Sequence, residues 1–442
     1  MEETLEKYAL EHINDYADLI KFKSISAQNL ELPETANYLA QIFSELGAVC
    51  VKKLGAKTAP IVFAEFNGND PTKTILFYHH YDVQPPEPLE KWDSEPFEPT
   101  IHEGKLFARG ASDNKGELIA RLLLVKYFQA HGGLPVNVKF FVEGQEEIGS
   151  PQIEEIVTQN KALLKADACI WEGGGKNNSD NYQIVGGMRG ISVFDVEVRT
   201  ADVDLHSSLA SYAENAAWRL IRGLATLRDD QGHVLVEGFY DDIEPLSDQE
   251  IKAVKNSDFD LEKAKKRAGL RKTISQDPKF ELVNQPTLTI NGLDAGYQGS
   301  GIKTVIPHLA KAKLDCRLSP SQDPEKIATL IQAHFNKHGF ADLKVHYRLG
   351  ELGFRSEMND PFVALVLKEA TKIYGKDTKY LPNSAGGGPA EIFGKTLKLP
   401  ILAFGVTYAG SQVHSPNEHI RLADFGQGTQ LLGEILTVYG NN

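Results

Sequence analysis

The stretch of residues 140–150 constrains the fold of this chain more than any other. An apolar run typical of a strand ends there in three carboxylates, Glu143, Glu146 and Glu147, with glycines at positions 144 and 149. Two adjacent side chains cannot point in one direction on an extended or turning backbone, so one of the paired glutamates can bind a cation while the other faces a water molecule. This division of labour is typical of metallohydrolases. A solvated acidic turn is the alternative for the stretch taken alone.

Length, charge and cysteine content limit the class of protein. At 442 residues, with 41% hydrophobic and 24% charged residues, the chain is long enough for two or three globular domains. The net charge of −13 argues against a nucleic-acid or anionic membrane partner, because such surfaces need clustered Lys and Arg. The three cysteines are far apart and form no Cys-x-x-Cys pair, so neither a disulfide framework nor a thiolate zinc site is indicated. Since the N-terminus is acidic and no run of about 18 apolar residues occurs, we expect a cytoplasmic protein without a membrane span.

Strand and helix patterns alternate along the first part of the chain. Strands of buried type are predicted at residues 61–66, 74–78, 136–142 and 168–171. Helical periodicity is found at residues 4–22, 33–46, 117–129 and 151–164. This alternation predicts an α/β sandwich with a largely parallel sheet.

The pattern changes after residue 186. Residues 191–198 alternate strictly between apolar and polar, which is typical of a strand with one exposed face. Further strands are predicted at 287–290, 309–318 and 343–347, with helices at 214–227 and 324–337. The α/β pattern returns with a helix at 361–374. The sequence therefore predicts a discontinuous first domain of residues 1–185 and 357–442, interrupted by a ferredoxin-like second domain of residues 186–356.

Side chains that can bind a metal follow the predicted strands, where open α/β sheets bind their ligands. His80 and Asp82 are two residues apart, so Asp82 can accept a hydrogen bond from the second ring nitrogen of a metal-bound His80. The other candidates lie at strand ends or in loops and are Asp113, Glu146, Glu147, Glu172 and His414. A set of His, Asp and Glu without Cys suits zinc, cobalt or manganese at a catalytic site. Each residue alone could be a core histidine, a helix cap or a surface charge, but together they favour a metal site.

The motifs that carry these residues resemble, in order, those of the M20-type metallopeptidases. They occupy residues 78–85, 110–116, 143–150, 204–208, 304–307 and 412–418. The chain is similar to the cytosolic nonspecific dipeptidases and carnosinases of that family and, more broadly, to its deacylases and carboxypeptidases. The resemblance spans essentially the whole chain. It implies an α/β catalytic sandwich of the zinc-exopeptidase type with an inserted ferredoxin-like α+β lid and dimerisation domain.

The resemblance also implies two divalent metal ions in each subunit. Asp113 would bridge them, with His80 and Glu172 completing one site and Glu147 and His414 the other. Zinc is the expected metal, with manganese or cobalt as alternatives. Two such ions can hold a bridging water, lower its pKa and stabilise the oxyanion formed when the water attacks an amide carbonyl.

Further roles follow from the resemblance. Glu146 would be the general base that takes the proton of the water and passes it to the leaving amine, and Asp82 would orient His80. His206 is placed like a family histidine that reaches into the active site of a partner subunit, which would make the enzyme a homodimer. Arg317 is placed like an arginine that binds the substrate carboxylate. The peptide bond after the bridging aspartate, Asp113–Asn114, would be cis.

A glycine-rich loop offers backbone N–H groups for the same substrate carboxylate. Its candidate binding residues are Ser384, Gly386, Gly387 and Gly388, and a structural glycine turn is the alternative. The chain departs from the dipeptidase pattern in this loop, because Ala385 and Gly388 stand where those enzymes carry an acidic residue and a hydroxyl. Two more departures are Glu172, where dipeptidases commonly have Asp, and Asn114, where a second aspartate is usual.

These features predict hydrolysis of the amide bond of a dipeptide or short peptide, by an exopeptidase of the dipeptidase or carboxypeptidase type. An N-acyl-amino-acid deacylase, in which the same water attacks an amide without a free amine, is the first alternative. A non-catalytic metal-binding relative is the second. Glu146 argues against the second, since a protein that only binds metal has no need of a base beside its ligands.

Overall fold

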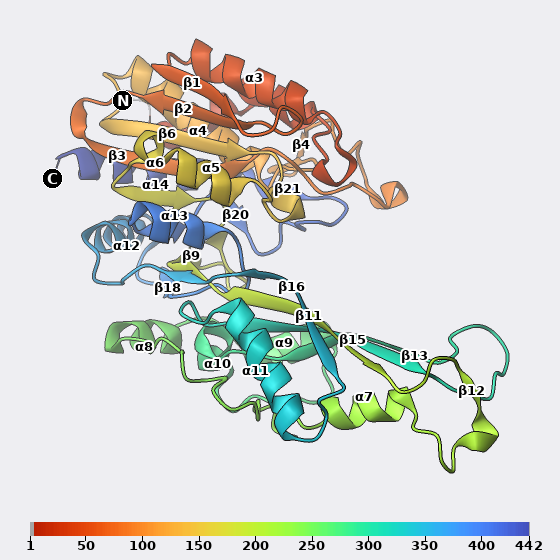
Figure 1. Cartoon of the computed structure of the whole chain (residues 1–442). Coiled ribbons are helices and arrows are strands. Elements are labelled where there is room, and N and C mark those ends of the chain that lie inside the picture. Colours follow the sequence, from red (N-terminus) through yellow and green to blue (C-terminus); the bar gives the residue numbers. More distant parts are fainter. Residues whose placement is uncertain (1–3, 442) are drawn as a thin grey trace.

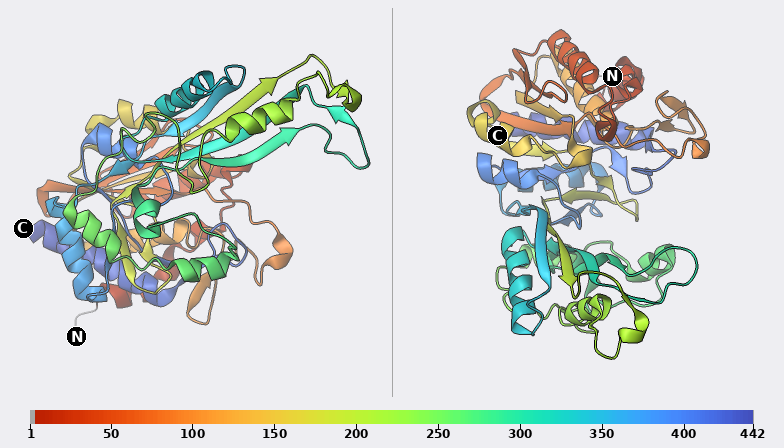
Figure 2. Two further views of the ribbon diagram at one scale, coloured as in Figure 1. Left: turned by 90° about the horizontal axis from the view of Figure 1, so that it is seen from below. Right: turned by 45° about the vertical axis from the view of Figure 1, so that its right-hand side comes forward.

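A computed structural model describes residues 4–441, which form two lobes (Figures 1 and 2). The larger lobe surrounds a ten-stranded mixed sheet, and the smaller lobe carries a four-stranded antiparallel sheet. Segments from both ends of the sequence share the larger sheet, whereas the smaller sheet comes from the middle of the chain. This is the predicted order of an α/β body interrupted by an inserted β-rich body. The domain boundaries after residues 185 and 356 stay predictions.

The centre of the larger sheet is parallel, and antiparallel pairs join it to the strands on both sides. Its strand order is β1 (Cys50–Leu54), β2 (Ile61–Phe66), β6 (Val136–Glu143), β3 (Asp70–His80), β7 (Ala168–Trp171), β19 (Ile401–Ala403), β9 (Tyr182–Val185), β8 (Gly175–Lys176) and β20 (Thr407–Tyr408), and β18 (Lys379–Leu381) also pairs with β9. The strands from β6 to β19 are parallel, but β1, β2 and β6 pair antiparallel, as do β19, β9 and β8. The sheet is therefore mixed rather than largely parallel. The carboxyl ends of its four central strands still meet at one edge.

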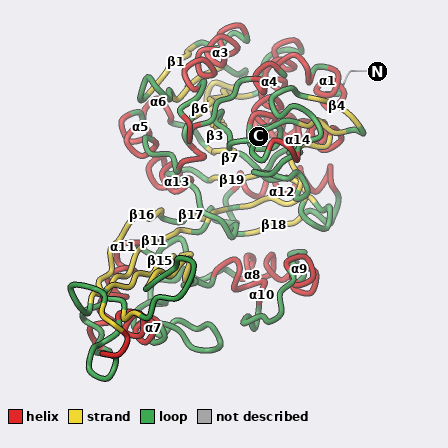
Figure 3. Tube along the Cα trace, turned by 90° about the vertical axis from the view of Figure 1, so that its right-hand side faces the viewer, coloured by secondary structure: helices red, strands yellow, loops and turns green. Residues whose placement is uncertain are grey.

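Helices cover both faces of this sheet (Figure 3). One face packs against α1 (Leu5–Glu11), α3 (Leu32–Glu45), α4 (Lys115–Ala130), α12 (Pro361–Tyr374) and α14 (Leu422–Asn441). The other packs against α5 (Ile153–Gln159), α6 (Lys161–Leu164) and α13 (Ala390–Leu397). In β3, Phe77 belongs to the first core and its neighbours Leu76 and Tyr78 to the second, as the side-chain period of two requires. Burial on both faces explains why the central strands read as continuous apolar runs.

The smaller sheet has one covered and one open face. Its strands are β13 (Thr289–Ala295), β15 (Leu309–Leu318), β11 (Gly190–Arg199) and β16 (Lys344–Glu351), in that order. Side chains of β11 and β15 alternate between a core under α7 (Ala216–Leu224) and α11 (Pro324–Lys337) and a more exposed face. The strict alternation predicted for residues 191–198 is confirmed.

Two helical predictions were too long. The helix expected at residues 4–22 is broken into α1, a 3-10 turn at Ile13–Tyr16 and α2 (Asp18–Lys21). The helix expected at residues 151–164 is divided into α5 and α6. Three more short helices precede β13, namely α8 (Asp248–Lys255), α9 (Leu261–Ala268) and α10 (Pro278–Asn284). Helices this short leave an apolar period much like that of a longer one, so periodicity alone did not find the breaks.

Candidate metal centre

Five ionisable side chains meet at the carboxyl edge of the larger sheet. His80 ends β3, and Glu172 follows β7 directly. Glu147 lies on a single 3-10 turn just after β6. Asp113 lies two residues before α4, and His414 comes from the loop between β20 and β21 (His419–Arg421). Parallel strands bring these ends together although the residues are spread over most of the chain.

The two carboxylate oxygens of Asp113 face two different histidines. His80 Nε2 lies 2.9 Å from Asp113 Oδ1 and 3.0 Å from Glu172 Oε2. His414 Nε2 lies 3.1 Å from Asp113 Oδ2 and 3.1 Å from Glu147 Oε2. Ligand atoms of a tetrahedral zinc site, with bonds near 2.0 Å, lie about 3.3 Å apart. Each triad therefore has nearly the spacing of a ligand set, and Asp113 belongs to both.

The electrostatics of the cluster favour a bound cation. Burial alone would lower the pKa of His80, but Glu172, Asp113 and Asp82 outweigh it and raise that pKa well above its ordinary value. Hydrogen bonds to Asp113 and then to Glu147 raise the pKa of His414 to about 10. Protons on these imidazoles supply the positive charge that the surrounding carboxylates need. Divalent cations between the same groups would meet that need in their place.

Two buried oxygen atoms support this interpretation. Within the described part of the chain, Glu147 Oε1 has no hydrogen-bond donor. Glu172 Oε2 lies against His80 but forms no hydrogen bond of acceptable geometry. Buried polar atoms without partners are rare in native structures. A metal ion at each triad would satisfy these atoms, so the donor set fits the two divalent ions that the resemblance implied.

Glu146 lies beside the cluster and differs from the groups that form ion pairs with the histidines. Its carboxylate makes no ion pair or hydrogen bond in the described structure. Burial raises the pKa of Glu146 to about 7; the charge of His80 opposes this rise, and the carboxylates of Asp113 and Glu147 add to it. A carboxyl group in this condition can take up and release a proton near neutral pH.

Asp82 makes contacts different from those that the sequence predicted. His80 Nδ1 lies 2.9 Å from the backbone oxygen of Asp82 and 3.4 Å from its Oδ1. The carboxylate instead accepts the backbone N–H groups of Glu146 and Glu147, at 3.2 and 3.1 Å. Asp82 therefore orients the histidine through its main chain and holds the paired glutamates through its side chain. The spacing of two residues correctly predicted that His80 and Asp82 lie on the same side of the chain. It could not show which atom of Asp82 accepts the hydrogen bond from His80.

The candidate substrate-carboxylate residues lie together at another place. A Cβ on Gly387 would be 3.6 Å from Arg317 Nη1, so the arginine borders the glycine loop. The backbone N–H groups of residues 386–388 and the Arg317 guanidinium make no hydrogen bond within the described residues. The hydroxyl of Ser384 already donates to the Gly386 carbonyl at 3.0 Å. Three free N–H groups and a free guanidinium are donors that a carboxylate could use.

His206 does not join the cluster within one chain. It lies on β12 (Leu205–His206), which pairs with β14 (Val305–Ile306) at the far tip of the smaller lobe (Figure 1). The side chain is exposed, and its Nδ1 accepts the backbone N–H of Ser208 at 3.1 Å. Its Nε2 is left free for another contact.

Comparison with known proteins identifies the chain. The model of the peptidase family M20/M25/M40 matches residues 76–438. The chain belongs to this family. The Beta-Ala-His dipeptidase of Rattus norvegicus is 31% identical over 388 residues, which cover 85% of this chain and 78% of the relative. The Cys-Gly metallodipeptidase dug1 of Schizosaccharomyces pombe is 29% identical over 97% of this chain and 95% of the relative. The crystal structure of the M20 family metallo-carboxypeptidase Sso-CP2 from Sulfolobus solfataricus has a TM-score of 0.88 and 37% identity over 98% of this chain and 100% of that one.

As an M20 family metallopeptidase, the protein shares the fold of its structural neighbours, a catalytic domain with a lid or dimerisation domain. The Asp113–Asn114 peptide bond is cis, as the resemblance implied. Within residues 4–441, no helix is both long and apolar enough to cross a membrane.

Several residues around the M20 metal centre were missed by the sequence analysis. Gln84 Nε2 donates to Glu147 Oε2 at 2.8 Å. Glu117, buried on α4, accepts the backbone N–H of Gly173, next to Glu172, at 3.2 Å. Glu418 holds the loop of Asp113. Gln84 and Glu418 stand inside motifs already noted, but nothing in the sequence assigned them a role.

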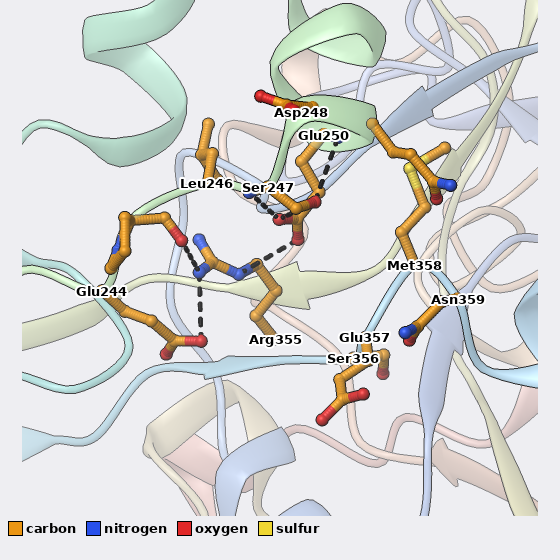
Figure 4. Close-up of a pocket in the computed structure, with 12 residues that line it drawn as sticks. Glu244, Leu246, Ser247, Asp248, Glu250, Arg355, Ser356, Glu357, Met358 and Asn359 are labelled. Carbon is orange, nitrogen blue, oxygen red and sulfur yellow. Dashed lines mark hydrogen bonds and ion pairs between the residues drawn. The ribbon is translucent and has the colours of Figure 1, made fainter.

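Two cavities differ in their relation to the metal centre. One of about 580 Å³ is lined by Gly174, Gln412 and Val413, close in sequence to the candidate ligands Glu172 and His414. The other, of about 620 Å³, lies where α8 meets the segment after β16 (Figure 4). Neither lining includes a candidate ligand. Only the first cavity is lined by residues that stand next to candidate ligands in the sequence.

Proposed function

We propose that this M20 metallopeptidase holds two divalent metal ions and hydrolyses dipeptides or removes the C-terminal residue of short peptides. The observation that carries the proposal is the position of Asp113, whose two oxygens contact two separate histidines, each of which also contacts a glutamate. A bridging carboxylate with a histidine and a glutamate on each side is a ligand set for two ions. Zinc fits the nitrogen and oxygen donors, with manganese and cobalt as alternatives.

The residues of the chain have distinct tasks in this reaction. His80, Asp113 and Glu172 would hold one ion, and Asp113, Glu147 and His414 the other. Bound ions would lower the pKa of a water and stabilise negative charge on the carbonyl oxygen. Glu146 would take the proton of the attacking water at its carboxylate and pass it to the nitrogen of the leaving amine.

Binding of the substrate would use the second group of residues. The carboxylate of the substrate would accept hydrogen bonds from the Arg317 guanidinium and from the free N–H groups of the glycine loop. Ser384 would then act through the shape of the loop, because its hydroxyl is already bonded to Gly386. These contacts would recognise the C-terminal carboxylate of the peptide. Recognition of that end would make the enzyme an exopeptidase.

The names of the relatives and the shape of the site both bear on which substrates of the family this enzyme takes. Relatives named for Beta-Ala-His and Cys-Gly substrates favour dipeptides, while the metallo-carboxypeptidase neighbour favours longer peptides. The cavity of about 580 Å³ that Gly174, Gln412 and Val413 line would give room to residues beyond a dipeptide. Ala385 stands in the glycine loop where dipeptidases carry an acidic residue, which favours N-acyl-amino-acid hydrolysis as the second candidate. All three cysteines are free, which supports the predicted cytoplasmic location.

Substrate comparison tests the proposed function. We expect the metal-loaded enzyme to turn over a free dipeptide and an unblocked tripeptide faster than the N-acetylated dipeptide. Chelation should abolish all three activities, and added zinc, manganese or cobalt should restore them. Release of amino acids, measured by chromatography, reports the rates. A preference for the acetylated substrate would replace the exopeptidase by the deacylase, and full activity after metal removal would contradict both.

We further propose that the enzyme is a homodimer in which His206 of one subunit serves the site of the other. Exposed apolar side chains gather on β12, α7, β13 and the adjoining loops of the smaller lobe: Val203, Tyr212, Trp218, Ile221, Leu293 and Ile302. Trp218 is 61% exposed and Ile302 is 95% exposed. An apolar surface of this kind is typical of a protein interface.

Gel filtration tests the homodimer. The wild-type protein should elute as a dimer, and Trp218→Glu should yield a monomer because a charge would be buried in the interface. The monomer should lose kcat by about 10²-fold, the cost of losing one donor to the carbonyl oxygen. Val49→Glu, at an exposed apolar residue of the larger lobe, should stay dimeric and active. A fully active monomer would remove the role of His206.

A further inference from the structure

The carboxylate of Glu418 lies at the centre of the loop that carries Asp113. Its Oε1 accepts the backbone N–H groups of Ser112 and Asp113 at 2.8 and 2.9 Å. Its Oε2 accepts the N–H of Gly110 at 3.1 Å and Nη1 of Arg109 at 2.6 Å. The Glu418 side chain is fully buried. Four donors on one buried carboxylate fix the course of the loop that leads into the candidate bridging residue.

Glu418 also belongs to the loop that carries His414. Its own carbonyl accepts the N–H of Ala108 at 3.1 Å, and the next residue begins β21, which pairs with β5 (Lys105–Phe107). The main chain and side chain of Glu418 thus join two loops about 300 residues apart in sequence. One loop supplies Asp113 and the other supplies His414.

The remaining ligands have other supports. His80 and Glu172 stand at the ends of central strands, and Glu147 is held by Asp82 and Gln84. The ion between His80, Asp113 and Glu172 would keep two ligands on strand ends if the Asp113 loop moved. The ion between Asp113, Glu147 and His414 would keep only Glu147, because its other two ligands are on the loops that Glu418 joins.

We propose that Glu418 is a positioning residue that fixes Asp113 relative to His414 and thereby sets the affinity of the second of these two ion sites. The inference rests on the two-ion assignment made in the proposed function. It concerns unequal binding at the two sites, which can be measured without any substrate.

Replacement of Glu418 by glutamine removes one of the two acceptor oxygens that the four donors require. The two oxygens of Glu418 accept two donors each. A glutamine has one oxygen, and its amide N–H₂ would face two donors in either orientation. The shape of the side chain is kept, so the loops lose hydrogen bonds without gaining a cavity. Glu418→Asp keeps both oxygens with a shorter reach and should be intermediate.

A matched control separates this role from the general cost of removing a buried acid. Glu250 is 5% exposed, lies 3.2 Å from Arg355 Nε and accepts the backbone N–H of Ser247 at 2.7 Å (Figure 4). It is therefore a buried carboxylate bound to an arginine and to main chain, as Glu418 is. It lies outside the metal centre, so Glu250→Gln should lower thermal stability without changing metal binding.

Titration of the metal-free proteins with zinc against a competing chelator tests the proposal. Wild type and Glu250→Gln should bind two ions, whereas Glu418→Gln should bind the first ion normally and the second about 10- to 100-fold more weakly. Absorption spectra of the cobalt-loaded proteins should show the same change at one site only. The melting temperature of each metal-free protein gives the structural cost alone.

Three outcomes would overturn the proposal. In the first, Glu418→Gln binds both ions with wild-type affinity. In the second, the variant binds both ions more weakly by the same factor, in proportion to its loss of thermal stability. In the third, the wild-type protein binds fewer than two ions, which would also remove the two-ion assignment. A wild-type protein that binds two ions but hydrolyses no peptide would contradict the proposed reaction and leave the measurement of Glu418 intact.

Discussion

Glu146→Gln is expected to keep the metal content of the enzyme and to lower kcat by at least about 10²-fold, the low end for a lost acid–base catalyst. Glutamine has the same shape as glutamate but cannot take up a proton from the attacking water. Both histidines of the cluster contact Asp113, Glu172 or Glu147, and neither forms an ion pair with Glu146. The substitution should therefore spare the ligands. Metal per subunit by elemental analysis and steady-state kinetics on a dipeptide measure the two effects.

The control for this prediction is Glu154→Gln, at an exposed glutamate of α5 nearby in sequence. It should have wild-type kcat and metal content. Turnover of Glu146→Gln close to wild type, with both ions bound, would show that another group moves the proton. Loss of an ion from Glu146→Gln would mean that Glu146 is a ligand, and the division of labour between the paired glutamates would then be wrong.

The parts of the fold that the sequence predicted well are those whose residues respond to local burial. The strands at Ile61–Phe66 and Ala168–Trp171 were predicted with the bounds that they have. Both are buried on two faces, so their apolar runs are continuous and end where burial ends. The strict alternation of β11 came from one open face in the same way. Local patterns of this kind are sufficient to predict a strand, because the apolar or polar character of each residue follows its own burial.

The short strands β8 and β20 at one flank of the larger sheet could not be predicted in that way. β8 and β20 each span only two residues and lie among glycines and polar residues, so neither shows a period. Their pairing depends on loops that meet only in the folded chain. The contacts of Glu418 and Glu117 were missed for the same reason. Glu418 bonds to Arg109, 309 residues away, and no spacing in the sequence records such a contact.

The metal centre shows that several candidate ligands considered together predict a site that no single residue predicts. The candidate ligands were found because they stand at the ends of predicted strands or in loops, and the structure brings all five of them together. His206 follows no such strand of the larger sheet, and its proposed place is in another subunit. The resemblance to a family suggested that role, because a contact between subunits leaves no periodic pattern in the sequence of one chain.

Asp113→Asn is expected to remove at least one ion and to lower kcat/KM by more than about 10²-fold, since loss of a group that merely supports a ligand already costs about 10- to 100-fold. The reason is the geometry of the carboxylate, whose Oδ1 faces His80 and whose Oδ2 faces His414. Asparagine offers one oxygen, and its N–H₂ group would face the other ion. The effect should exceed that of Glu418→Gln, in which Asp113 itself is intact.

Zinc titration and kinetics on a free dipeptide measure both parts of this prediction, with Asp377→Asn at an exposed aspartate of the larger lobe as the control. A variant that binds one ion and has lost most activity would agree with a bridging ligand. Binding of two ions with wild-type affinity would show that the sites are separate, and the proposed bridging role would then fail. Loss of both ions together would mean that neither histidine site is stable without the shared carboxylate, which would make Asp113 the residue on which the whole centre depends.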